Sequence, residues 1–216
     1  MALLDIVLPP ACAACGRIGG LLCGGCRASL RPPARPDDRF YAADAGVVIG
    51  DALELALAAF AYEHVLRRLL QRLKYIGAAR VAAPLAEAAA PSLQALLRLT
   101  GPAALVPVPV HVVRQRERGY NQAERLAIEL GRRTRMPTVD LLARPHATVK
   151  QHRLDRAGRL RNLRGAFIMR GHARPPPTVI VVDDILTTSA TLEACASVLR
   201  EAGVLHVYGF AIGREV

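Results

Sequence analysis

Apolar residues recur along this chain in two spacings, which predict two kinds of element. In residues 63–75 they stand three and four positions apart, which is typical of an amphipathic helix, and Gly77 would end it. Residues 82–99, 121–135 and 191–202 predict three further helices. Short apolar runs predict strands at 104–110, 178–182 and 204–212, with shorter ones at 139–143 and 165–169. Strands that alternate with helices favour an α/β fold with a mainly parallel sheet.

The N-terminal third is organised differently. Residues 47–62 mix strand-like and helix-like signals, and residues 30–44 are rich in proline and charge, which is typical of a linker. We therefore expect two units, a small cysteine-rich knuckle at 1–36 and an α/β domain at 45–216.

Four of the five cysteines form two close pairs, Cys12 with Cys15 and Cys23 with Cys26. Two CxxC steps with glycines between them suit one tetrahedral, structural zinc ion with no open position for catalysis. Two disulfides or free thiols are the alternatives, and a reducing compartment argues against disulfides. The fifth, Cys195, is expected to be a buried apolar residue of a helix.

The run 178–182 is followed by Asp183 and Asp184 and then by a hydroxyl-rich loop that leads into a helix. In an open α/β sheet, ligands bind at the carboxyl ends of the strands. Two acids there can bind the vicinal hydroxyls of a ribose or hold Mg²⁺, directly or through water. The helix start favours a phosphate. The alternative is an ordinary turn with a helix cap.

The composition indicates which kinds of partner the chain favours. The chain has 216 residues, a net charge of +11 and 52% hydrophobic residues, so a wholly disordered chain is excluded and anionic partners are favoured. Arginine carries nearly all of the charge, since Lys74 and Lys150 are the only lysines. The N-terminus lacks a secretory leader, and the longest apolar stretch contains two acids, so we expect a cytoplasmic protein that is not integral to a membrane.

Residues 144–174 hold eight arginines and Lys150 against a single acid, Asp155, which gives this segment a local charge of +8. We expect a basic loop. It either closes over a substrate, contacts a nucleic-acid backbone, or is simply solvated. The turn around residues 116–121 is a second candidate anion site, for which a solvated basic turn is the alternative, with Asn121 capping the next helix. For Lys74 we consider two roles, contact with a phosphate of the ligand or an ordinary exposed lysine near a helix C-terminus.

The stretch VIVVDDILTTSAT resembles the signature of type I phosphoribosyltransferases, which bind 5-phosphoribosyl-1-pyrophosphate (PRPP). This resemblance implies that Asp183 and Asp184 hold the ribose, with Mg²⁺ accompanying PRPP. It also implies that a loop wraps the 5-phosphate, made of Thr187, Thr188, Ser189, Ala190 and Thr191. The family commonly has glycine where Ser189 stands.

Five blocks in order extend the resemblance over nearly the whole chain: the double CxxC, LKYIG, VPVPV, RERGYNQAERLA, and the segment from QHRL to RNLRGAF. Together they are similar to the ComF family, which includes ComF and GntX-like proteins. The resemblance implies pyrophosphate or polyanion contacts from two loops, at Arg116, Arg118, Gly119, Lys150, Gln151, Arg153, Arg159, Arg161 and Asn162.

The implied function is binding of PRPP, another ribose phosphate or a polyanion, in a role tied to DNA uptake and natural transformation. Single-stranded DNA and proteins of the uptake machinery are the expected partners. The alternative is an active Mg²⁺-dependent phosphoribosyltransferase of nucleotide or nucleobase metabolism. No residue of the sequence stands out as a catalytic base, and the acceptor is not evident from the sequence.

Overall fold

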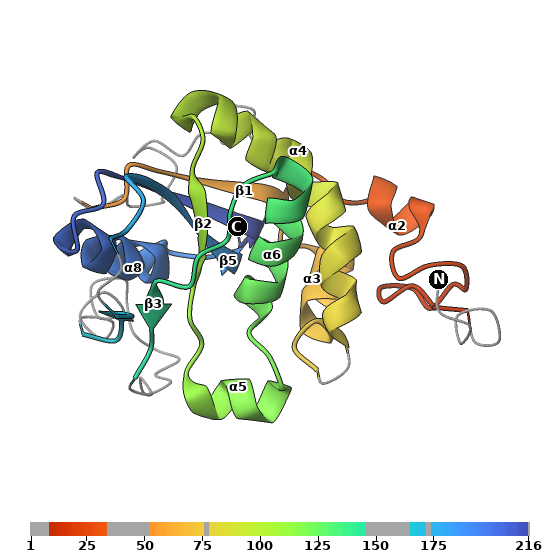
Figure 1. Cartoon of the computed structure of the whole chain (residues 1–216). Helices are drawn as coiled ribbons and strands as arrows, with labels where there is room; N and C mark the ends of the chain where they lie inside the picture. The colour runs from red at the N-terminus through yellow and green to blue at the C-terminus, as the bar shows by residue number, and fades with distance from the viewer. Residues whose placement is uncertain (1–8, 34–51, 76–77, 146–164, 172–173, 216) are drawn as a thin grey trace.

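A computed structural model describes residues 9–33, 52–75, 78–145, 165–171 and 174–215. Its centre is a four-stranded sheet in the order β1-β6-β5-β2, in which every neighbouring pair of strands is parallel (Figure 1). The strands are β1 (Leu55–Ala61), β2 (Ala104–Pro107), β5 (Thr178–Leu186) and β6 (His206–Arg214). The α/β fold with a mainly parallel sheet is thus confirmed, and it fits the phosphoribosyltransferase-like architecture.

Each strand is buried on both faces, which explains why the strands are continuous apolar runs. On β5, Ile180 and Val182 belong to one hydrophobic cluster, whereas Val179 and Val181 belong to the other. Alternate residues of a strand point to opposite faces, so the two clusters are the two sides of the sheet.

Helices cover both sides (Figure 1). Leucines and alanines of α3, α4 and α6 pack in the first cluster, and α8 packs in the second with Leu192, Cys195 and Leu199. Cys195 is fully buried, as predicted. The bounds are α3 (His64–Arg72), a 3-10 turn (Ala78–Val81), α4 (Ala82–Thr100), α6 (Gln122–Thr134) and α8 (Ala190–Glu201). All four predicted helices are therefore confirmed.

Two predictions need correction. A further helix, α5 (Val112–Arg118), stands where a turn was expected. It has no buried residue, because its only apolar residues, Val112 and Val113, are adjacent and half-exposed. The strand predicted at 178–182 continues through both aspartates to Leu186, since β6 extends beside it. The mixed signals at 47–62 contain a strand, β1.

A two-stranded antiparallel sheet lies on the α8 side, formed by β3 (Leu142–Ala143) and β4 (Ile168–Met169). Both strands are shorter than the segments predicted from the sequence. Leu142 and Phe167 are buried in the same cluster as α8, so this small sheet is fixed to the α/β core.

Within the part of the chain that the structure describes, no helix is both long enough and apolar enough to cross a membrane.

Candidate functional site

The two aspartates lie at the carboxyl end of the sheet. The last register pair of β2 joins Pro107 to Val182, and Val108 still donates to the Val182 carbonyl at 2.9 Å. Beyond this point β5 keeps only β6 as a neighbour, through pairs such as Asp183 with Ala211. Asp183 and Asp184 therefore belong to a part of β5 that has no strand neighbour on its β2 side among the described residues.

The two carboxylates begin on opposite faces of β5. By the alternation of the strand, Asp184 faces the side of Ile180 and Val182, where α3 packs. There Lys74, just after α3, lies with its Nζ 3.6 Å from Asp184 Oδ2. Asp183 faces the α8 side, although its Oδ1 turns back to accept from the Asp184 N–H at 2.8 Å. The two carboxyl groups therefore start on opposite sides of the sheet, and Lys74 faces Asp184 from the α3 side.

Asp183 has an unusual electrostatic setting. Burial and the neighbouring charge of Asp184 raise its pKa well above the ordinary carboxyl range, and the Asp184 N–H and the charge of Lys74 only partly oppose this. Raised carboxyl pKa values are typical of groups that bind ligands or protons.

Arg144 is a site residue that the sequence analysis did not single out. Its guanidinium lies over the Phe167 ring, 5.3 Å from the centroid. Burial and the nearby charge of Arg114 lower its pKa, and the neighbouring Cys195 and Asp183 oppose the shift. Arg144 is thus a cation near Asp183. The nearest signal in the sequence was its position directly after a short strand, at the start of the basic segment.

The hydroxyl-rich loop connects β5 to α8 as predicted, and α8 begins at Ala190. Ser189 is buried and has a left-handed backbone, with φ of +58°, which glycine adopts most easily. Its Oγ donates to the carbonyl of Thr188 at 2.6 Å and does not cap the helix. The backbone shape usual for glycine is therefore kept although serine occupies the position. Contact of Thr187, Thr188 and Thr191 with a phosphate remains a prediction.

The second predicted loop lies at the end of α5. Arg116 is exposed, Arg118 donates to Gln122 Oε1 at 2.9 Å, and Gly119 has φ of +77°. Asn121 caps α6 as predicted, because its Oδ1 accepts from the Ala123 N–H. The remaining predicted contacts lie outside the described residues, namely Lys150, Gln151, Arg153, Arg159, Arg161 and Asn162.

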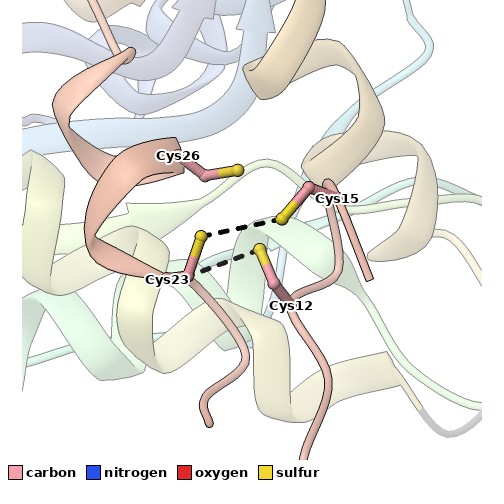
Figure 2. Close-up of side chains that lie close together, drawn as sticks. All are labelled: Cys12, Cys15, Cys23 and Cys26. Atoms are coloured by element: carbon pink, nitrogen blue, oxygen red, sulfur yellow. Dashed lines mark hydrogen bonds between the residues drawn. The ribbon is translucent and has the colours of Figure 1, made fainter. Parts of the chain in front are cut away.

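The four paired cysteines of the N-terminal segment converge on one another (Figure 2). Their sulfur atoms all lie within 4.8 Å of one another, with Cys15 Sγ and Cys23 Sγ 3.6 Å apart. Tetrahedral zinc–thiolate bonds of about 2.3 Å require similar sulfur–sulfur separations. Cys23 precedes the short helix α2 (Gly24–Ala28), which carries Cys26. The residues present therefore fit one zinc ion held by four thiolates.

The thiols differ in acidity. Burial acts to raise the pKa of Cys12, but N–H groups of Cys23, Cys15 and Ala14 lower it to about 6. For Cys26, burial and the neighbouring thiols raise the pKa to about 12. Backbone N–H groups directed at a sulfur favour the thiolate, the form that binds metal.

Comparison with known proteins gives three kinds of match. Residues 3–37 match the family model of the double zinc ribbon domain, which together with the sulfur cluster supports structural zinc. The chain is 36% identical to competence protein F of Haemophilus influenzae over 115 residues, which is 51% of this chain and half of the relative's length. It is 34% identical to competence protein ComFC of Bacillus subtilis over 46% of this chain and 39% of the relative.

The broader match is to the DNA utilization protein YhgH of Salmonella typhi. It has 31% identity over 159 residues, which is 72% of this chain and 70% of the relative. The match extends well beyond the zinc ribbon. The chain therefore belongs to the ComF family, together with the competence proteins F and ComFC and the YhgH proteins.

Proposed function

We propose that the protein binds PRPP, or a closely related ribose phosphate, together with Mg²⁺ at the carboxyl end of its sheet. One observation carries the proposal. The acid pair lies on β5 beyond the end of β2, and five residues after Asp184 the buried, left-handed Ser189 precedes the start of α8. Acids suit the ribose hydroxyls and Mg²⁺, and a helix start suits a phosphate.

The proposed biological role is in DNA uptake and natural transformation, with single-stranded DNA and uptake proteins as partners. The names of the relatives support it, since they refer to competence and to DNA utilization. The net charge of +11 and the exposed basic helix α5 support contact with a nucleic-acid backbone.

We further propose the division predicted from the sequence, a zinc ribbon at 1–36 and a ligand-binding domain at 45–216, and a cytoplasmic location. Four thiols that hold a metal suit a reducing compartment.

Calorimetric titration of PRPP with Mg²⁺ tests the ligand. The wild type is compared with an Asp183→Asn/Asp184→Asn double variant, and Asp140→Asn serves as control because this acid is exposed and pairs with Arg170. Ribose 5-phosphate and pyrophosphate are titrated separately. We expect binding of PRPP and of ribose 5-phosphate that the double variant loses. Equal binding of PRPP by all three proteins would contradict a ribose site at the acid pair. Binding of pyrophosphate without binding of ribose 5-phosphate would indicate a general polyanion site.

A further inference from the structure

Lys74 is the cation that directly faces the acid pair from the α3 side. Its Nζ lies 3.6 Å from Asp184 Oδ2, and both side chains are partly buried. This separation exceeds that of a charge-assisted hydrogen bond, about 2.7–2.9 Å. A pair of partly exposed charges at this distance is weak enough to exchange partners.

The backbone on either side of Lys74 is held by a residue from a distant loop. The Tyr120 hydroxyl lies 2.5 Å from the carbonyl oxygen of Leu73 and 3.2 Å from that of Tyr75. Tyr120 is buried, and burial raises its pKa, so the hydroxyl keeps the proton that it donates. A single phenol thus bridges the two carbonyls that flank Lys74.

Tyr120 is itself fixed in place. The next residue, Asn121, donates from Nδ2 to the Val108 carbonyl and accepts from the Ala123 N–H. These bonds join the segment after β2 to the start of α6. The position of Lys74 is therefore tied to the frame of the sheet through Tyr120 and Asn121.

Two adjacent acids that bind the hydroxyls of a phosphorylated sugar face an electrostatic conflict, since the ligand carries negative charge beside them. A cation that neutralises the acids in the free protein and then contacts the ligand anion resolves it. A lysine suits this task because its charge sits on a flexible four-carbon stem.

We propose that Tyr120 is a positioning residue that holds Lys74 as the counter-ion of Asp184, and that Lys74 shifts from this carboxylate to an anionic group of the ligand on binding. The shift rests on the proposed function, whereas the positioning does not.

NMR on the full chain tests the positioning without a ligand. Lysine labelled with ¹³C at Cε alone gives two side-chain signals, from Lys74 and Lys150, and a Lys150→Arg variant assigns them. We expect Asp184→Asn and Tyr120→Phe to shift the Lys74 signal. Tyr208→Phe is the matched control. Burial and the nearby Glu54 raise the pKa of this hydroxyl, which lies near the amino end of β6, and its loss should leave the Lys74 signal in place.

Calorimetry with PRPP and Mg²⁺ tests the shift. Tyr120→Phe and Lys74→Met should each weaken binding roughly threefold to tenfold, the range expected for one hydrogen bond. The double variant should bind no more weakly than Lys74→Met alone, since Tyr120 acts through Lys74.

Each failure has its own signature. An unchanged Lys74 signal in Tyr120→Phe overturns the positioning, as does a double variant whose loss is the product of the two single losses. A wild type that does not bind PRPP overturns the proposed function and the shift, while the NMR result still decides the role of Tyr120.

Discussion

Arg68, in the middle of α3, donates to the carbonyl oxygen of Ala14 at 3.3 Å, between the two cysteines of the first CxxC pair. Arg27 of α2 forms an ion pair with Glu87 of α4, with a nitrogen–oxygen distance of 2.6 Å. Cys12, Ala14 and Cys26 share one hydrophobic cluster with the leucines of α3 and α4. The zinc ribbon is therefore packed onto the core and is not a separate appendage in space.

This packing predicts that metal loss weakens the whole molecule. Cys12→Ser should remove zinc and lower the melting temperature of the α/β part as well. A loss of about 3 kcal/mol corresponds to roughly 6–12 °C for a chain of this size. Metal analysis and calorimetry measure both effects, with Cys195→Ala as a control that lacks a thiol outside the cluster. Unchanged zinc content in Cys12→Ser would contradict the four-thiolate site.

The raised pKa of Asp183 predicts how stability depends on pH. The folded protein binds this proton more tightly than the unfolded chain, so the contribution of Asp183 to stability is greatest at low pH. It declines as the pH rises from the ordinary carboxyl pKa, about 3.9, toward the folded value. Asp183→Asn should flatten this decline and increase the free energy of unfolding at neutral pH. Denaturant unfolding at several pH values measures it, and Asp140→Asn should leave the profile unchanged. An equal decline in Asp183→Asn would refute the assignment.

Ser189 gives a prediction about the turn before α8. A side chain in the left-handed region costs roughly 1–2 kcal/mol, which glycine avoids at the expense of about 0.5–1 kcal/mol of chain entropy. Ser189→Gly should therefore be slightly more stable than wild type. Ser189→Ala should be less stable, because it keeps the Cβ and loses the bond to Thr188. Denaturant unfolding of the three proteins should give this order. A wild type more stable than both variants would mean that the hydroxyl, and not the backbone, determines the turn.

The basic helix α5 gives a prediction about DNA. If Arg114 and Arg116 each contact a phosphate of single-stranded DNA, the binding constant of the Gln variants should fall less steeply with salt. The negative slope of log K against log salt should become smaller in magnitude by about 0.7 per contact. Arg132→Gln is the matched control, since Arg132 is exposed but pairs with Glu129 within α6. Fluorescence anisotropy at several salt concentrations gives the slopes, and equal slopes in all variants would exclude α5 as the contact.

The sequence predicted the elements with strong periodicity and missed those that depend on neighbours. The helical stripes and apolar strands were found because burial imposes their spacing. The extension of β5 through Asp183 and Asp184 was missed because it depends on β6 running beside it. Helix α5 was missed because it has no apolar stripe.

The same limit applies to the candidate site. The acid pair and the cysteines were visible as local motifs. Arg144 and Tyr120 were not assigned their contacts, since their partners Phe167 and Leu73 are distant in sequence. Only the fold brings such residues together.

Glu193 ties the start of β1 to the first turn of α8. Its buried carboxylate accepts from the N–H groups of Ala52 and Leu53, at 3.0 and 3.2 Å. A shortened chain that began at Leu55 would contain all four strands of the main sheet and still lose both donors. A buried carboxylate without them is costly, so the α/β part needs the residues before its first strand to fold well. An expressed fragment whose first residue is chosen from the start of β1 would therefore lack hydrogen-bond donors that α8 needs.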